Sequence, residues 1–162
     1  MKIIPFLIAL LWFSLPAQDS SDVRAEYRLA AKNQEKAEKL YEALSATTET
    51  DNVLFIAYKG ATATLMAKYA KGVKSKTTYF KEGKSLIEQA IEAAPENIEL
   101  RYIRLSVQEN APRIVRYNNE IAEDKQFILD HYDGIKDAGT KKYIKGFVSQ
   151  STSFSDAEKE LF

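Results

Sequence analysis

The sequence predicts an all-α protein in which antiparallel helical hairpins stack into a short superhelix. Apolar residues recur at spacings of three and four along most of the chain, which is the period of an amphipathic helix. Alternation of apolar and polar residues, which is typical of strands, is scarce. Beyond residue 17, Pro95 and Pro112 are the only prolines that could interrupt a helix.

The first 17 residues are expected to be a signal peptide that lies outside the fold. Lys2 supplies a positive charge, and the apolar run that follows, residues 3–13, has 11 residues. This run is shorter than the roughly 20 residues that cross a bilayer as a helix, so cleavage after Ala17 is favoured over an uncleaved anchor. Residues 18–162 are expected to form a single α-helical domain that is exported to the periplasm or secreted.

The composition excludes several kinds of chemistry. The chain has 162 residues, with 23 basic and 23 acidic side chains, no cysteine and a single histidine, His131. Disulfides, thiolate nucleophiles, cysteine-rich zinc sites and multi-histidine metal sites are therefore excluded. A net charge near zero is unlike that of most nucleic-acid-binding domains. We expect no cofactor, no metal and no nucleic-acid partner.

The first half of the chain is expected to contain three helices. The first covers residues 23–44, because apolar residues follow one another there at spacings of three and four; its stripe is Val23, Tyr27, Ala30, Gln34, Ala37, Tyr41 and Leu44. A second helix covers residues 52–70 and ends near Gly72. Residues 73–76 are expected to be a connection. The third helix then carries Tyr79, Phe80, Gly83, Leu86, Ile87, Ala90, Ile91 and Ala94, and ends at Pro95.

The second half continues in the same way. Asn97 is expected to cap a fourth helix that closes near Asn110. A helical turn after Pro112 should lead to a longer helix, which starts at Asn118 or Asn119 and is broken at 133–134. A last full helix carries Tyr143, Ile144, Phe147 and Val148. The pair Ser155 and Glu158 matches a capping box that opens a terminal turn.

Short connections make consecutive helices antiparallel, so the first four are expected to pair as two hairpins, residues 23–70 and 77–109. At the join of the third and fourth helices lies the string GKSLIEQAIEAAPEN. Its Gly83, Ile87, Ala90 and Pro95 resemble the second half of a tetratricopeptide repeat, which implies a tetratricopeptide-like superhelix.

One feature departs from that repeat. Gly60 resembles the small residue of a repeat's first helix. The stretch from Gly60 to Gly83, however, is longer than the corresponding stretch within a repeat of roughly 34 residues. The resemblance therefore implies an over-long first helix. The chain also resembles small exported helical proteins of Gram-negative bacteria, especially through IELRYIRLSVQENAP and IAEDKQFIL, which implies export and adds no mechanism.

A helical superhelix has a concave face that can hold an extended peptide or a partner helix. The candidate contact residues on it are Tyr58, Tyr69, Tyr102 and Tyr117. The alternative is that they belong to the core, because tyrosines at helical spacing usually pack inside with the hydroxyl at the rim.

The strongest local charge bias lies between residues 68 and 84, where lysines face only Glu82; these lysines are Lys68, Lys71, Lys74, Lys76, Lys81 and Lys84. With aromatic residues interleaved, this segment could bind anionic lipid headgroups or acidic envelope polymers, with Lys71, Lys74 and Lys76 as contacts. The alternative is a solvated linker.

Three carboxylates, Glu120, Glu123 and Asp124, share one helical face and could bind a cation or act as acid and base. Pairing with upstream arginines would make them structural instead. In that case Arg104, Asn110 and Glu123 would form a polar network that fixes how the fourth and fifth helices cross.

His131 has acidic neighbours in the sequence and could be a metal ligand or a general base. The alternative is an imidazole that is favoured by a helix C-terminus.

The sequence therefore favours a non-enzymatic exported adaptor that binds a protein or peptide in the cell envelope. Two alternatives stay open. One is peripheral binding to an anionic lipid or polymer through residues 68–84, and the other is a hydrolase that uses Glu123, Asp124 or His131. No catalytic residue is assigned.

Overall fold

The computed structural model describes residues 20–48 and 50–162, so the expected signal peptide, residues 1–17, lies outside the described residues. The described part has eight α-helices, two 3-10 helices and no strand, which confirms the all-α prediction. The elements are α1 (Ser20–Ala30), α2 (Gln34–Ala43), α3 (Val53–Tyr69), α4 (Val73–Ala93), α5 (Ile98–Asn110), η1 (Arg113–Val115), α6 (Ile121–His131), η2 (Tyr132–Gly134), α7 (Ala138–Val148) and α8 (Asp156–Lys159). Among the described helices, none is both long and apolar enough to cross a membrane.

The single helix expected over residues 23–44 is wrong, because α1 and α2 are separate. Asn33 has an extended backbone (φ −143°, ψ 120°), and its side chain accepts a hydrogen bond from the backbone N–H of Lys36 at 3.0 Å. This N-cap starts a new helix within the apolar stripe. The stripe runs across the break because α1 and α2 both contact α3, and Ala30 and Ala37 are fully buried.

The connection expected at residues 73–76 is also wrong, because these residues form the first turn of α4. The actual connection is the turn 70–72, in which Gly72 takes a φ of +80°. Residues with a Cβ rarely adopt that conformation, so the glycine permits a connection of only three residues between α3 and α4. α3 and α4, with 17 and 21 residues, form one long antiparallel hairpin.

The two helices of this hairpin cross where two glycines meet. A Cβ built on Gly60 would lie 2.7 Å from the carbonyl oxygen of Gly83, so only glycine fits at this distance between the backbones. The expected pairing of residues 23–70 and 77–109 is therefore wrong, since the close partner of α3 is α4. Gly83 lets α4 approach α3 closely, because an added Cβ there would meet Gly60 and Thr64 of α3.

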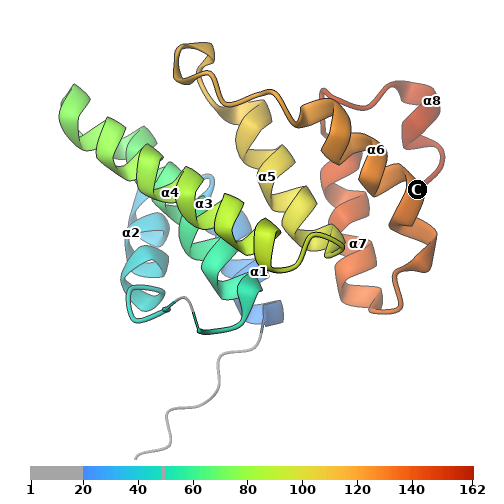
Figure 1. Ribbon diagram of the computed structural model, residues 1–162, viewed down its shortest axis with the longest axis horizontal. Coiled ribbons are helices and arrows are strands. Elements are labelled where there is room, and N and C mark those ends of the chain that lie inside the picture. Colours follow the sequence, from blue (N-terminus) through green and yellow to red (C-terminus); the bar gives the residue numbers. More distant parts are fainter. Residues whose placement is uncertain (1–19, 49) are drawn as a thin grey trace, which may run out of the picture.

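The helices form a stack in which the odd-numbered helices contact one another and the even-numbered helices lie beside them (Figure 1). α1, α3 and α5 each contact the helix that follows and also the next odd-numbered helix, while α2 and α4 contact the helix after them. This is the arrangement of stacked helical hairpins. The more specific likeness to tetratricopeptide repeats stays a prediction.

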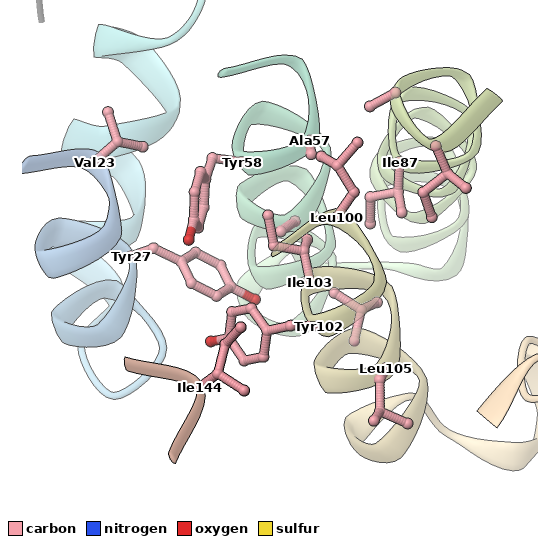
Figure 2. Close-up of a cluster of buried hydrophobic side chains, with 14 of the residues drawn as sticks. Val23, Tyr27, Ala57, Tyr58, Ile87, Leu100, Tyr102, Ile103, Leu105 and Ile144 are labelled. Atoms are coloured by element: carbon pink, nitrogen blue, oxygen red, sulfur yellow. The ribbon is translucent and has the colours of Figure 1, made fainter. Parts of the chain in front are cut away.

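The core lies where the odd-numbered helices meet, and Figure 2 shows Tyr27, Tyr58, Tyr102 and Ile144 converging there from α1, α3, α5 and α7. α5 is central, because nine of its 13 residues are buried. Charged residues on α5 are therefore surrounded by protein, and they must find partners on neighbouring helices.

The predicted ends of the helices are largely confirmed. As predicted, the side chain of Asn97 caps α5, and Ser155 and Glu158 form both bonds of the capping box. The second helix was expected to begin at residue 52, and the side chain of Asn52 caps α3 there. The start predicted at Asn118 or Asn119 is wrong: α6 begins after Glu120, which makes no side-chain cap.

Candidate functional site

The end of the α3–α4 hairpin is a projecting basic surface, which we call the basic tip and define as residues 68–76. Figure 1 shows the start of α4 at the upper left, beyond the other helices. Residues 71–78 are all exposed, because the neighbouring helices end short of this part of the hairpin. The lysines of the tip are Lys68, Lys71, Lys74 and Lys76.

The tip carries positive charge that is not neutralised locally. The sequence has no acidic residue between Asp51 and Glu82. None of the four lysines forms an ion pair with another residue that the structure describes. The ammonium of Lys68 lies 5.2 Å from the ring centre of Tyr69, which is half-buried. At the first position of α4, the apolar Val73 is 82% exposed among these charges.

A second exposed segment follows α5. In and around η1, residues 112–116 are all exposed, and Ile114 is 87% exposed. Arg113 and Arg116 flank it, and Arg116 takes a φ of +49° that turns the chain back toward the protein. Neither arginine forms an ion pair with another residue in the described part of the chain.

Tyr117 joins this segment to α4. Its ring is 3% exposed and packs edge-on against Phe80, with centres 6.0 Å apart. Its hydroxyl donates a hydrogen bond to Glu88 at 2.6 Å, and the ammonium of Lys84 lies 5.0 Å from its ring centre. Burial and the Glu88 carboxylate raise the pKa of Tyr117 above its usual range. The segment around η1 is therefore held against the same helix that begins at the basic tip.

Three of the four tyrosines predicted to line a binding face lie in the core instead. Tyr58 is 0% exposed, Tyr102 5% and Tyr117 3%, so their rings are not accessible to a partner. This agrees with the alternative that tyrosines at helical spacing pack in the core, and Tyr102 packs against Tyr143 of α7 with ring centres 5.2 Å apart. Of the four, Tyr69 is half-buried and lies at the basic tip.

The polar network observed between α5 and α6 differs in membership from the predicted network of Arg104, Asn110 and Glu123. Arg104 is buried and donates two hydrogen bonds to Asp124, both of 2.7 Å. The third nitrogen of its guanidinium, Nη1, donates a hydrogen bond to Glu88 at 2.8 Å. Glu123 is exposed, accepts from Arg101 at 2.6 Å and lies 3.8 Å from Arg104.

Asn110 is not part of this network, because it is exposed and donates to the carbonyl of Ser106 in its own helix at 2.8 Å. The prediction that the carboxylates pair with upstream arginines is confirmed for Glu123 and Asp124. The pairing links α5 to α6 as expected, with Asp124 in place of Asn110. Burial raises the pKa of Asp124, and the hydrogen bonds from Arg104 oppose that change.

His131 lies exposed at the last position of α6. Its ring stacks on Phe127 with centres 4.0 Å apart, and Nδ1 is 2.8 Å from the carbonyl oxygen of Phe127. Among the described residues, no group of three or more acidic, histidine or cysteine side chains could hold a metal ion. The position of His131 agrees with the structural alternative, an imidazole at a helix C-terminus.

The sequence analysis missed a buried ion pair between α1 and α5. Arg24 donates to both carboxylate oxygens of Glu99, at 2.8 and 2.9 Å, and the hydroxyl of Tyr58 donates to the same carboxylate at 2.7 Å. Burial and then Glu99 raise the pKa of Tyr58 well above its usual value. The available signal was Glu99 itself, a charge between the apolar Ile98 and Leu100 at the start of α5.

A hollow of about 410 Å³ opens beside this ion pair. It lies where α1, α3, α5 and α7 begin, and its lining includes Arg24, Leu54, Asn97 and Asp137. A second hollow of about 230 Å³ lies between the end of α5 and residues 152–153. The first is lined by groups that already bond within the protein, such as Arg24 and Glu99. In the second, Gln108 donates to Glu120, and its buried Oε1 has no hydrogen-bond partner among the described residues.

Comparison with family models, with curated proteins and with solved structures finds no match to this chain. The function must therefore be argued from the geometry of the described residues.

Proposed function

We propose that the protein is a non-enzymatic binding protein, located outside the cytoplasm, that attaches to an anionic surface through the basic tip. The observation that carries the proposal is the projecting end of the α3–α4 hairpin, where four lysines are exposed without an acidic partner among the described residues. Such a cluster attracts phosphate, sulfate or carboxylate groups on a lipid surface or an envelope polymer.

The strength of this attraction can be bounded. Each lysine near an anionic membrane contributes about 1 kcal/mol, so the four lysines of the tip contribute about 4 kcal/mol. This corresponds to a dissociation constant of about 1 mM. Attachment through the tip alone is thus weak, and it depends on salt because the screening length falls from about 10 Å at 0.1 M to about 3 Å at 1 M ionic strength.

The geometry of the other candidate residues supports binding over catalysis. Asp124 is 0% exposed and both of its oxygens accept hydrogen bonds from Arg104, so a substrate cannot reach that carboxylate. Glu123 bonds to Arg101, and His131 rests on Phe127 away from both. An acidic surface on a protein partner could contact the same lysines. Lipid vesicles, a polymer resin and a defined protein must therefore be compared as binding partners.

The test reverses the charge of the tip. The triple variant Lys71→Glu, Lys74→Glu and Lys76→Glu removes about 3 kcal/mol or more of attraction, so binding to vesicles with anionic lipid should weaken more than about a hundredfold. Co-sedimentation with anionic and with neutral vesicles measures this, and retention on a sulfated polymer resin tests the polymer.

The matched control is Lys32→Glu, Lys36→Glu and Lys142→Glu, which makes the same change in net charge at exposed lysines outside the tip. It should bind nearly as well as the parent protein. Equal losses in both triple variants would reduce the proposal to a net-charge effect. Absence of binding by the parent to every anionic probe, together with salt-resistant capture of a defined protein, would replace it with a protein-binding function.

A further inference from the structure

We propose that the segment around η1 is a second contact, and that it and the basic tip together dock the protein on an anionic lipid bilayer, with Val73 and Ile114 inserted among the headgroups. This inference rests on the proposed function and makes it more specific. It names the bilayer, and not a soluble polymer, as the anionic surface.

The two exposed segments have the same chemistry. Each presents an aliphatic side chain almost fully to solvent, Val73 at 82% and Ile114 at 87% exposure, and Val115 beside Ile114 is exposed to a smaller extent. Each aliphatic side chain is flanked by basic residues, Lys71 and Lys74 in the first case and Arg113 and Arg116 in the second. An exposed aliphatic group between cations fits the boundary between headgroups and acyl chains, where the cations meet phosphates and the aliphatic group leaves water.

The helical register of α4 places the two segments on one side of the molecule. Val73, Lys76, Phe80 and Lys84 are separated by three, four and four residues and so share one helix face. Phe80 and Lys84 on this face contact Tyr117, which comes three residues after Ile114. From Val73 to Phe80 the helix rises about 10 Å, so the tip and the η1 segment are separated by about two turns of a rigid helix.

The arrangement also leaves room for a flat surface. Figure 1 shows the start of α4 and the loop that follows α5 at the upper left edge of the molecule, and a straight line across both meets no other described helix. Acidic groups of the neighbouring elements are engaged within the protein: Glu82 accepts from Tyr41, Glu88 accepts from Arg104 and Tyr117, and Glu120 accepts from Gln108. The Arg104 guanidinium offsets the charge of Glu88, which reduces its repulsion of the headgroups.

The aliphatic side chains distinguish a bilayer from a polymer. A soluble polyanion can pair with the lysines and arginines, but it offers no apolar phase for Val73 or Ile114. A second basic contact on the same rigid body also raises the affinity above the weak value of the tip alone, because both contacts form without a further loss of translational freedom.

The first experiment follows the two side chains directly. The chain has no cysteine, so Val73→Cys, Ile114→Cys and Leu161→Cys each create a single site for an environment-sensitive dye. Leu161, which is 68% exposed in the C-terminal turn, is the control. On addition of phosphatidylglycerol-containing vesicles, dyes at 73 and 114 should shift to the blue and be quenched by lipid-borne quenchers, while the dye at 161 should not change.

The second experiment measures affinity. Ile114→Ser should weaken binding to anionic vesicles about tenfold and leave retention on a sulfated polymer unchanged. Arg113→Glu should weaken both. Leu161→Ser should change neither, and circular dichroism should show the same melting temperature for all three variants and the parent.

The outcomes separate this inference from the proposed function. If the dye at 73 shifts and the dye at 114 does not, or if Ile114→Ser binds vesicles like the parent, the second contact is wrong and attachment through the basic tip stands. If vesicles bind but neither dye shifts, insertion is wrong and attachment is purely electrostatic. If the parent binds no anionic vesicle or polymer, both proposals fail.

Discussion

Gly60 of α3 and Gly83 of α4 lie back to back where the helices cross, and a Cβ built on Gly60 would lie 2.7 Å from the carbonyl oxygen of Gly83. This contact determines how closely the two longest described helices approach each other. It also aligns them so that the turn at Gly72 projects as the basic tip. The proposed binding site therefore depends on two glycines that lie near the middle of α3 and of α4 and not at the end of the hairpin.

Replacing Gly83 by alanine should destabilise the protein by about 1 to 3 kcal/mol, because the new Cβ would meet the backbone of α3. The same replacement at Gly146 of α7, where nothing lies within 4 Å of an added Cβ, should stabilise it by up to about 1 kcal/mol through helix propensity. Urea unfolding measures both. A stabilising effect at both positions would show that the crossing of α3 and α4 is looser than described.

Replacing Arg104 by methionine should destabilise the protein by about 3 to 5 kcal/mol, because Asp124 would remain buried without its main partner. The control is Glu123→Gln, on the exposed carboxylate beside it, which should cost less than about 1 kcal/mol. Adding Asp124→Leu to Arg104→Met should recover part of the loss. Similar small effects of Arg104→Met and Glu123→Gln in urea unfolding would contradict a structural role for the buried pair.

Acid should weaken the cap and the ion pair that hold α8 as Glu158 becomes protonated. Hydrogen bonds from Lys125 and Ser155 lower the pKa of Glu158 from 4.5 to about 2. A lowered pKa in the folded state means that the carboxylate stabilises the docked α8 above about pH 4.5, and that this contribution is lost as the pH falls toward 2. The amide resonances of Ser155 and Glu158 should report the transition. In Glu158→Gln they should be insensitive to pH in this range, and an unchanged transition would contradict the assignment to Glu158.

Alkaline titration should reveal Tyr41 as a late-ionising tyrosine. Burial, followed by the hydrogen bond to Glu82, raises its pKa from 10.0 to about 12. Because the pKa is raised in the folded state, the contribution of this group to stability is full below pH 10 and is lost as the pH rises through about 12. The difference in ultraviolet absorbance between the parent and Tyr41→Phe should show one ionisation near pH 12. In Glu82→Gln that step should move toward pH 10, and a step near pH 10 in the parent would contradict the hydrogen bond.

The local signals of the sequence were sufficient for most helices and their ends. Asn97 and the Ser155–Glu158 box were both identified, because a cap involves only residues two or three positions apart. The same kind of signal was misjudged at Asn33. Its cap interrupts an apolar stripe that continues in phase on both sides, and periodicity does not show whether two segments in phase are one helix or two.

The sequence predicted the lysines of the candidate site but not their position in the fold or the second exposed segment. The lysines from 68 to 76 stand out by their charge, but their place at the end of a projecting hairpin follows from the start of α4 at Val73 and from its packing on α3. The contribution of Ile114 was not visible, since one isoleucine between arginines is ordinary until its exposure is known. Exposure depends on which helices cover a residue, and those helices come from distant parts of the chain.

Composition, periodicity and capping residues were thus enough to establish an all-α protein without cysteine chemistry and with a basic segment. Helix pairing, the burial of Tyr58 and Tyr102, and the partners of Arg24 and Arg104 could be known from the packed structure alone. The reason is physical: a helix forms through contacts within one or two turns, whereas the pair of Arg24 with Glu99 spans 75 residues of sequence and exists only when α1 and α5 meet.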